Sequence, residues 1–323
     1  MRIFPDKQAK SVEDIANYIM KKFSSNSAKL RAAYSWTAQH ISYDIDELNN
    51  RTTYKNENEL IERTLRTRKS VCSGYTKTFK AIAEKLGLNV QEISGYVKQN
   101  GKIDEDSHAW CAVKIAGKWK LIDPTWSAGT VSQGQFRKRF NDKWFLVEPG
   151  KIINSHMPFD PVWQFSYFPI NHKEFYTDKV ADSITSRFFN FPDTINKISM
   201  LSEKERIIAS NRRIISMGIY NSATEKHIEI NIKIIKSIQE SENVEKYNLA
   251  VNLYNQSCGI YNSYIKNQKN SVLKKKLNEA NLKLYEALQY LNGISLADRE
   301  MLSSVEKLKN MVHTLISDIK KIS

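Results

Sequence analysis

The chain has few of the residues that interrupt or crosslink a fold. Its 323 residues include only 11 glycines, seven prolines and three cysteines. Three cysteines exclude a small domain held together by a disulfide framework. No run of about 18 apolar residues occurs, which excludes a membrane-spanning helix. Hydrophobic residues make up 41% and charged residues 26% of the chain, so we expect a folded protein and, at this length, two domains.

The first residues, MRIFPDKQAKSVED, also lack the continuous apolar segment of a secretory signal. As written, the chain is expected in the cytoplasm. It would be exported if its N-terminus is truncated or processed.

Positive charge is abundant but spread along the chain. The net charge is +14, with +8 over residues 1–150 and +6 over residues 151–323. Basic runs such as residues 63–69 and 137–139 are short. We therefore expect solvated surface lysines and arginines, with binding to nucleic acid or an anionic surface as the lesser alternative.

Composition divides the chain into two parts. All six tryptophans lie at or before Trp163, all seven prolines lie at or before Pro192, and only three glycines follow Gly150. Long helices exclude proline and glycine, whereas strands and turns are punctuated by them. We predict an α+β domain over 1–172, a linker over 173–194 and an all-α helical bundle over 195–323.

The first part reads as helices followed by strands. Helical spacing of apolar residues covers 11–22 and 27–40, and a further helix is expected from Cys72 to about Leu86. Strands are expected over 90–97, 109–115 and 119–122, with a hairpin turn over 116–118. This order indicates helices packed on an antiparallel sheet.

The second part carries repeated apolar stripes. Helices are expected near 203–217, 223–240, 243–267, 270–292 and 296–321. Stripes of this kind are usually core, which indicates an antiparallel bundle; a tandem helix-pair repeat is the alternative. These helices could also bind a protein partner.

Three residues form a candidate nucleophilic site. Cys72 begins a predicted helix, where the helix dipole favours a thiolate. His108 opens one predicted strand, and Asp123 ends the next. A short hairpin would bring His108 and Asp123 side by side, and the helix packed on the sheet would present Cys72 to the histidine. This is an activated-nucleophile arrangement.

The flanking residues resemble the transglutaminase-like superfamily of papain-type thiol enzymes. The resemblance rests on Val-Cys-Ser-Gly-Tyr at 71–75, Ser-His-Ala-Trp at 107–110 and Asp-Pro-Thr-Trp at 123–126. The segment 34–44 looks like the upstream helix of this family, and the segments 144–149 and 156–164 are similar to its bacterial branch related to kyphoscoliosis-type peptidases. The resemblance covers about residues 10–165 and does not reach the C-terminal helices.

The resemblance implies a papain-like fold and a shared first reaction step. A Cys72 thiolate would attack a protein or peptide amide, with His108 and Asp123 completing the triad. Hydrolysis of the thioester would make the protein a cysteine peptidase or amidase. Transfer to a lysine would make it a crosslinking transglutaminase, and a noncatalytic peptide-binding or scaffold module is a third possibility. Candidate oxyanion donors are the Cys72 backbone N–H and, from the upstream helix, Trp36 and Gln39.

Other chemistry-bearing residues are expected to be structural. Cys111 lies three residues from His108 without a second ligand pair at zinc spacing, so no metal is expected and Cys111 should belong to the core. His156 and His172 lie in an aromatic, proline-containing stretch and are expected to be structural, although that stretch could rim the cleft. No glycine-rich phosphate loop is present, so no cofactor is expected.

Overall fold

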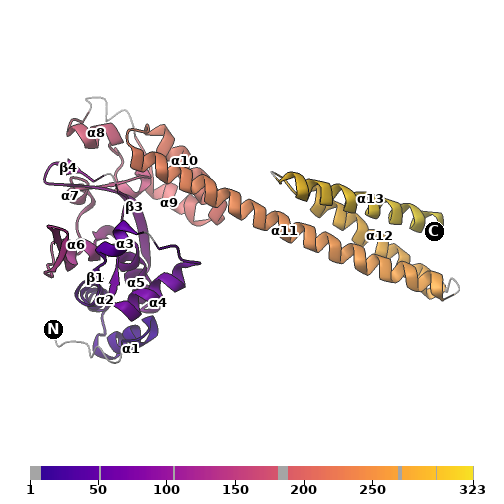
Figure 1. Ribbon diagram of the computed structural model, residues 1–323, viewed down its shortest axis with the longest axis horizontal. Helices are drawn as coiled ribbons and strands as arrows, with labels where there is room; N and C mark the ends of the chain where they lie inside the picture. The colour runs from indigo at the N-terminus through magenta and orange to yellow at the C-terminus, as the bar shows by residue number, and fades with distance from the viewer. Residues whose placement is uncertain are drawn as a thin grey trace. The chain divides into compact units, whose positions relative to one another are not determined.

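The computed structural model describes residues 9–50, 52–104, 106–180, 188–267, 271–295 and 297–322 (Figure 1). The chain forms two compact units, residues 1–228 and 229–323. Within the described residues, no helix has both the length and the apolar character needed to cross a membrane.

The first unit begins with helices that cap themselves locally. Helices α1 (Val12–Lys22) and α2 (Asn26–His40) start at Ser11 and Ser25, whose hydroxyls accept backbone N–H bonds from the first turn. Two short strands, β1 (Ser42–Tyr43) and β2 (Lys69–Ser70), pair in parallel. Between them lie α3 (Ile45–Asn49) and α4 (Glu57–Thr67). Helix α5 (Cys72–Lys85) follows β2 after one residue, so the pairing of β1 with β2 fixes where α5 begins.

A curled antiparallel sheet packs against α5. Its strands are β3 (Val90–Gln99), β4 (Lys102–Ile103), β5 (His108–Ile115), β6 (Lys118–Ile122) and β9 (His156–Pro158). The spatial order is β4-β3-β5-β6, and β9 pairs with β3. Strands β5 and β6 turn at Ala116 and Gly117, both with positive φ, as a two-residue hairpin requires. The expected α+β fold and the three expected strands are confirmed.

Each face of the sheet has its own core. On β5, Cys111 and Val113 belong to the cluster that includes Phe79 and Ile82 of α5. Trp110 and Ala112 belong to a second cluster on the opposite face. This alternation is the period-two pattern of a strand buried on both sides.

The remaining described elements of the first unit are α6 (Pro124–Ala128), β7 (Gly129–Ser132), β8 (Gln135–Lys138), α7 (Pro149–Ile152), η2 (Pro161–Gln164), α8 (His172–Thr177), α9 (Phe191–Ser199) and α10 (Glu203–Ser216). The first unit thus extends well beyond the expected domain end at 172. The expected linker, 173–194, includes most of α8 and the start of α9, and its residues 181–187 lie outside the described part.

Helix α10 is attached to the first unit by a charged contact. Arg213 binds both carboxylate oxygens of Asp160, at 2.8 and 2.6 Å. Its neighbour Ile214 is fully buried in a cluster with Tyr96, Met157 and Phe159. These contacts explain why residues from 195 onward do not all belong to the helical bundle.

The described part of the second unit consists of three helices. Helix α11 (Ser222–Lys266) begins in the first unit and continues into the second without the expected break near 241–242. It is followed by α12 (Ser271–Asn292) and α13 (Arg299–Ile322). Ser257 donates to the carbonyl of Ala280 and Asn243 donates to the carbonyl of Ser295, so α11 and α12 run antiparallel. The helical bundle is confirmed for this part of the chain.

Candidate active site

Cys72 is the first residue of α5 and is partly exposed. Its backbone N–H has no partner within the helix, because the first N–H groups of a helix lack one. One turn later, the Thr76 hydroxyl donates to the carbonyl of Ala109 on β5, at 3.1 Å. This bond ties the helix that carries Cys72 to the strand that carries His108.

Gly74 allows the chain to approach itself closely at this helix start. A Cβ at position 74 would lie 2.0 Å from the Ser70 hydroxyl and 2.7 Å from that of Thr64. Both neighbours are buried on rigid elements. The glycine of the Val-Cys-Ser-Gly-Tyr segment is therefore a packing requirement that sets the position of Cys72.

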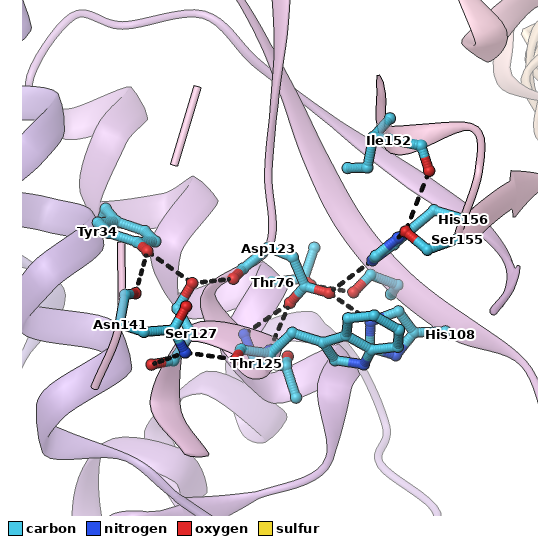
Figure 2. Close-up of polar contacts among 12 residues, drawn as sticks. Tyr34, Thr76, His108, Asp123, Thr125, Ser127, Asn141, Ile152, Ser155 and His156 are labelled. Atoms are coloured by element: carbon cyan, nitrogen blue, oxygen red, sulfur yellow. Dashed lines mark hydrogen bonds and ion pairs between the residues drawn. The ribbon is translucent and has the colours of Figure 1, made fainter. Parts of the chain in front are cut away.

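His108 and Asp123 meet as the hairpin predicts. His108 is the first residue of β5, and Asp123 directly follows β6, whose Ile122 pairs with Cys111. Nε2 of His108 lies 2.7 Å from Oδ2 of Asp123 (Figure 2). Because Nε2 is engaged by the carboxylate, Nδ1 is the nitrogen that remains for Cys72.

Asp123 is held by the helix that follows it. Its Oδ1 accepts the backbone N–H groups of Thr125 and Trp126, at 2.8 and 2.9 Å, as the N-cap of α6. Its own carbonyl accepts the Ser127 hydroxyl, which lies 2.6 Å from the Tyr34 hydroxyl of α2 (Figure 2). The carboxylate therefore caps a helix with one oxygen and binds imidazole with the other.

The charges of this pair stabilise one another. Burial alone would lower the pKa of His108, but the charge and hydrogen bond of Asp123, together with those of Cys72, raise it to about 10. Burial would raise the pKa of Asp123, but the charge of His108 and the bonds from both neighbouring imidazoles hold it far below its usual range. The arrangement thus favours an imidazolium at His108 beside the ionised Asp123 carboxylate.

A cleft of about 370 Å³ opens beside Cys72 and His108. Its aromatic lining comprises Tyr43, Tyr54, Phe159 and His227, and its acidic lining comprises Glu47, Glu92, Asp104 and Asp106. Burial, reinforced by the charge of Cys72, raises the pKa of Tyr43, so its hydroxyl keeps a proton to donate. His227 of α11 stacks on Phe159, with ring centroids 4.3 Å apart.

The structure does not bring Trp36 and Gln39 to this cleft. Trp36 is buried, stacks on His40 at 5.0 Å and lies under the guanidinium of Arg68. Gln39 is exposed on α2. Neither belongs to the described lining of the cleft. The expectation that Trp36 or Gln39 supplies an oxyanion donor therefore gains no support from the residues that line this cleft.

His156 is the site residue that the sequence did not reveal. Strand β9 pairs with β3, with Val97 opposite His156, and this brings Nε2 of His156 to 3.1 Å from Oδ2 of Asp123 (Figure 2). The segment 156–164 resembles a family motif, but a strand of three residues has no periodicity from which its place on the sheet could be predicted. Cys111, by contrast, is buried in the core as expected.

Two histidines and a carboxylate also form a set of potential metal ligands. The ligand atoms of His108, Asp123 and His156 all lie within 4.8 Å of one another. Both imidazoles, however, point at one carboxylate oxygen at hydrogen-bond distances of 2.7 and 3.1 Å. Hydrogen bonding to one carboxylate oxygen accounts for the cluster without a metal.

Comparison with known proteins agrees with the motifs. Residues 13–124 match the model of the Transglutaminase-like superfamily core. Kyphoscoliosis peptidases of Mus musculus and Homo sapiens are 29% and 30% identical over 174 residues, 51% of this chain and 26% of each relative. A crystal structure of a TGase is 21% identical, with a TM-score of 0.30, over 45% of this chain and 39% of that one. The chain thus spans about a quarter of these curated relatives. We conclude that residues 13–124 are similar to the transglutaminase-like superfamily core and that the chain is distantly similar to kyphoscoliosis peptidases.

Proposed function

We propose that the first unit is a cysteine peptidase or amidase that acts on protein amides through a thioester on Cys72. The observation that carries the proposal is the environment of one imidazole. His108 is bound by the Asp123 carboxylate at 2.7 Å, and the charge and hydrogen bond of Cys72 act on the same ring. Nucleophilic catalysis requires these three groups in this order: a nucleophile, a group that carries the proton, and a carboxylate that orients that group.

The first half-reaction forms the thioester. The Cys72 thiolate attacks the amide carbon, and the carbonyl oxygen becomes an oxyanion. The Cys72 backbone N–H and the Tyr43 hydroxyl, which lines the same cleft, are the candidate donors to that oxyanion. The His108 imidazolium then gives its proton to the leaving nitrogen, and the carbon–nitrogen bond breaks to leave an acyl-Cys72 thioester and a free amine.

The second half-reaction decides between hydrolysis and transfer. Neutral His108 takes a proton from water, the resulting hydroxide attacks the thioester, and the acid departs as the Cys72 thiolate is restored. A lysine amine in place of water would yield a crosslink.

One observation favours the second candidate, acyl transfer. Four carboxylate residues, Glu47, Glu92, Asp104 and Asp106, line the cleft, and its described lining residues include no lysine or arginine. Two of them are partly neutralised, since Glu47 pairs with Arg63 and Glu92 pairs with Lys77. An acidic lining would attract an amine acceptor. Incubation of a glutamine peptide with and without a primary amine distinguishes ammonia release from amine incorporation.

Thiol reactivity separates an enzyme from a noncatalytic peptide-binding or scaffold module. We expect iodoacetamide to label Cys72 at pH values well below the ordinary thiol range of about 8.5, and His108→Ala to abolish this low-pH labelling. Mass spectrometry from pH 4 to 9 measures each thiol separately. Partly exposed Cys258 of the second unit serves as the internal reference. Labelling of Cys72 that follows Cys258, or that is unchanged in His108→Ala, would argue for the noncatalytic module.

A further inference from the structure

The carboxylate of Asp123 has no acceptor position to spare. It is fully buried, and each of its oxygens accepts two hydrogen bonds. An ionised carboxylate offers about four such positions. Three of the donors, two backbone N–H groups and His108, belong to the helix cap or to the proposed triad. The fourth donor is the imidazole of His156, 33 residues further along the chain.

The protons of His156 can be assigned from its neighbours. Burial, together with the nearby charge of His108, lowers the pKa of His156 despite the adjacent carboxylate, so the ring is neutral and carries one N–H. The ionised Asp123 can only accept, so this N–H is on Nε2. Nδ1 is then an acceptor for the hydroxyl of Ser155, 2.8 Å away. The carbonyl of Ile152, 3.2 Å from the same hydroxyl, is the other acceptor for its single proton.

Aromatic side chains prevent the ring from turning. The centroid of the His156 ring lies 4.5 Å from that of Trp126, 5.0 Å from Trp144 and 5.2 Å from Trp110. The side chain is fully buried. Reorientation of the imidazole would require these rings to move, so its N–H remains directed at Asp123.

We propose that His156 is a positioning residue, a neutral donor that fixes Oδ2 of Asp123 toward His108. This inference rests on the proposed function, because it assigns a role within the same triad. With Oδ1 tied to the backbone and Oδ2 bound by a neutral imidazole, the carboxylate cannot rotate. Its single negative charge then serves one imidazolium, that of His108, since the other ring stays neutral. His156 thereby supports the thiolate–imidazolium pair without touching the substrate.

Two substitutions test whether the His156 hydrogen bond to Asp123 is needed, or only a side chain that fills the same space. His156→Gln places an amide N–H near the position of Nε2, whereas in His156→Asn the amide is one methylene short of Asp123. We expect Cys72 alkylation at pH 6 to fall by about tenfold or more in His156→Asn and to stay within about threefold of wild type in His156→Gln, because a hydrogen bond to a charged group is being removed or kept. His172→Gln, which alters another buried histidine bonded to Tyr96, is the matched control and should leave the rate unchanged.

Several outcomes decide the matter. Equal rates in His156→Asn and wild type, or an equal loss in the Gln and Asn variants, would overturn the positioning role. If His156→Asn does not fold by circular dichroism, His156→Met replaces it as a bulkier variant without a donor.

Ser155→Ala provides a second measurement, since loss of the hydroxyl releases Nδ1 of His156 and should slow alkylation of Cys72 by a smaller factor. His108→Ala is measured in parallel. If this substitution does not slow the alkylation of Cys72, the proposed function itself fails. If it does slow alkylation while the His156 variants react as fast as wild type, only the positioning role of His156 is overturned.

Discussion

The two compact units bury different kinds of side chain. In the first unit, ionisable groups such as Asp123, His108 and His156 lie in the interior and are paired with one another. In the described part of the second unit, 229–267, 271–295 and 297–322, the buried polar residues are Asn231, Asn243 and Ser257, and none is ionisable.

This difference affects how strictly the amino-acid sequence of each unit is constrained. The core of the second unit is a stripe of aliphatic residues along α12 and α13, to which α11 adds Ala250 and Tyr264, and apolar residues at helical spacing account for most of it. The first unit must satisfy each buried donor and acceptor with one particular partner, because an unpaired buried polar group is costly. The unit that is less tolerant of substitution is the one that holds the candidate active site.

The largest expected effect is that of Asp123→Asn. The substitution keeps the shape of the side chain but removes the negative charge that pairs with His108 and accepts the hydrogen bonds of both imidazoles. We expect the free energy of unfolding to fall by about 3–5 kcal/mol, because one member of a buried charge pair is lost. Asp142→Asn is the matched control: its partner Arg31 lies 2.5 Å away, but both side chains are exposed, so a change of about 0–1 kcal/mol is expected. Urea denaturation measures both.

The difference in the free energy of unfolding between wild type and Asp123→Asn should depend on pH. His108, whose pKa is raised to about 10, contributes stability fully below about pH 6.5 and loses it as the pH rises through 10. Asp123, whose pKa is lowered, contributes above about pH 3.9 and loses stability as the pH falls. The gap between wild type and Asp123→Asn should therefore be widest between about pH 4 and 6.5. A gap that grows toward pH 9 would contradict the ion pair.

A cavity in the second unit should cost stability without touching the site. Leu284 of α12 is fully buried, whereas Leu282 on the same helix is 71% exposed. We expect Leu284→Ala to lower the free energy of unfolding by about 2–5 kcal/mol and Leu282→Ala to change it by less than about 0.5 kcal/mol. Circular dichroism during urea denaturation measures this, and Cys72 alkylation should be unchanged in both variants. Slower alkylation in Leu284→Ala would show that the two units are energetically coupled.

A smaller effect tests where the first unit ends. Arg213→Met removes the bidentate partner of the nearly buried Asp160 carboxylate. We therefore expect the free energy of unfolding to fall by about 2 kcal/mol. The adjacent Arg212 is exposed, and Arg212→Met should have little effect on thermal unfolding. Equal melting temperatures for the two variants would indicate that α10 is not an integral part of the first unit.

Much of the first unit could be predicted because its signals are local. The apolar spacing of α1, α2 and α5 and the turn at Ala116 and Gly117 are properties of neighbouring residues. The hairpin brings His108 and Asp123 together over 15 residues. The proximity of these two residues therefore followed from local geometry alone.

The missed features depend on contacts between distant segments. The break expected near 241–242 does not occur in α11, where Asn243 is buried and donates to the carbonyl of Ser295, 52 residues later. The membership of α10 in the first unit depends on the pairing of Arg213 with Asp160, 53 residues earlier. Trp36 was a candidate for the cleft because its helix precedes the site in sequence, whereas it is buried beneath the guanidinium of Arg68, 32 residues later.

The helical faces, the hairpin and the candidates for nucleophile, imidazole and carboxylate could be predicted from the order of residues along the chain. That a second imidazole binds the same carboxylate could be seen only in the folded structure. The reason is physical: a hydrogen bond of about 3 Å between residues 33 positions apart exists only after β9 has paired with β3, and nothing in the periodicity of a three-residue strand encodes that pairing.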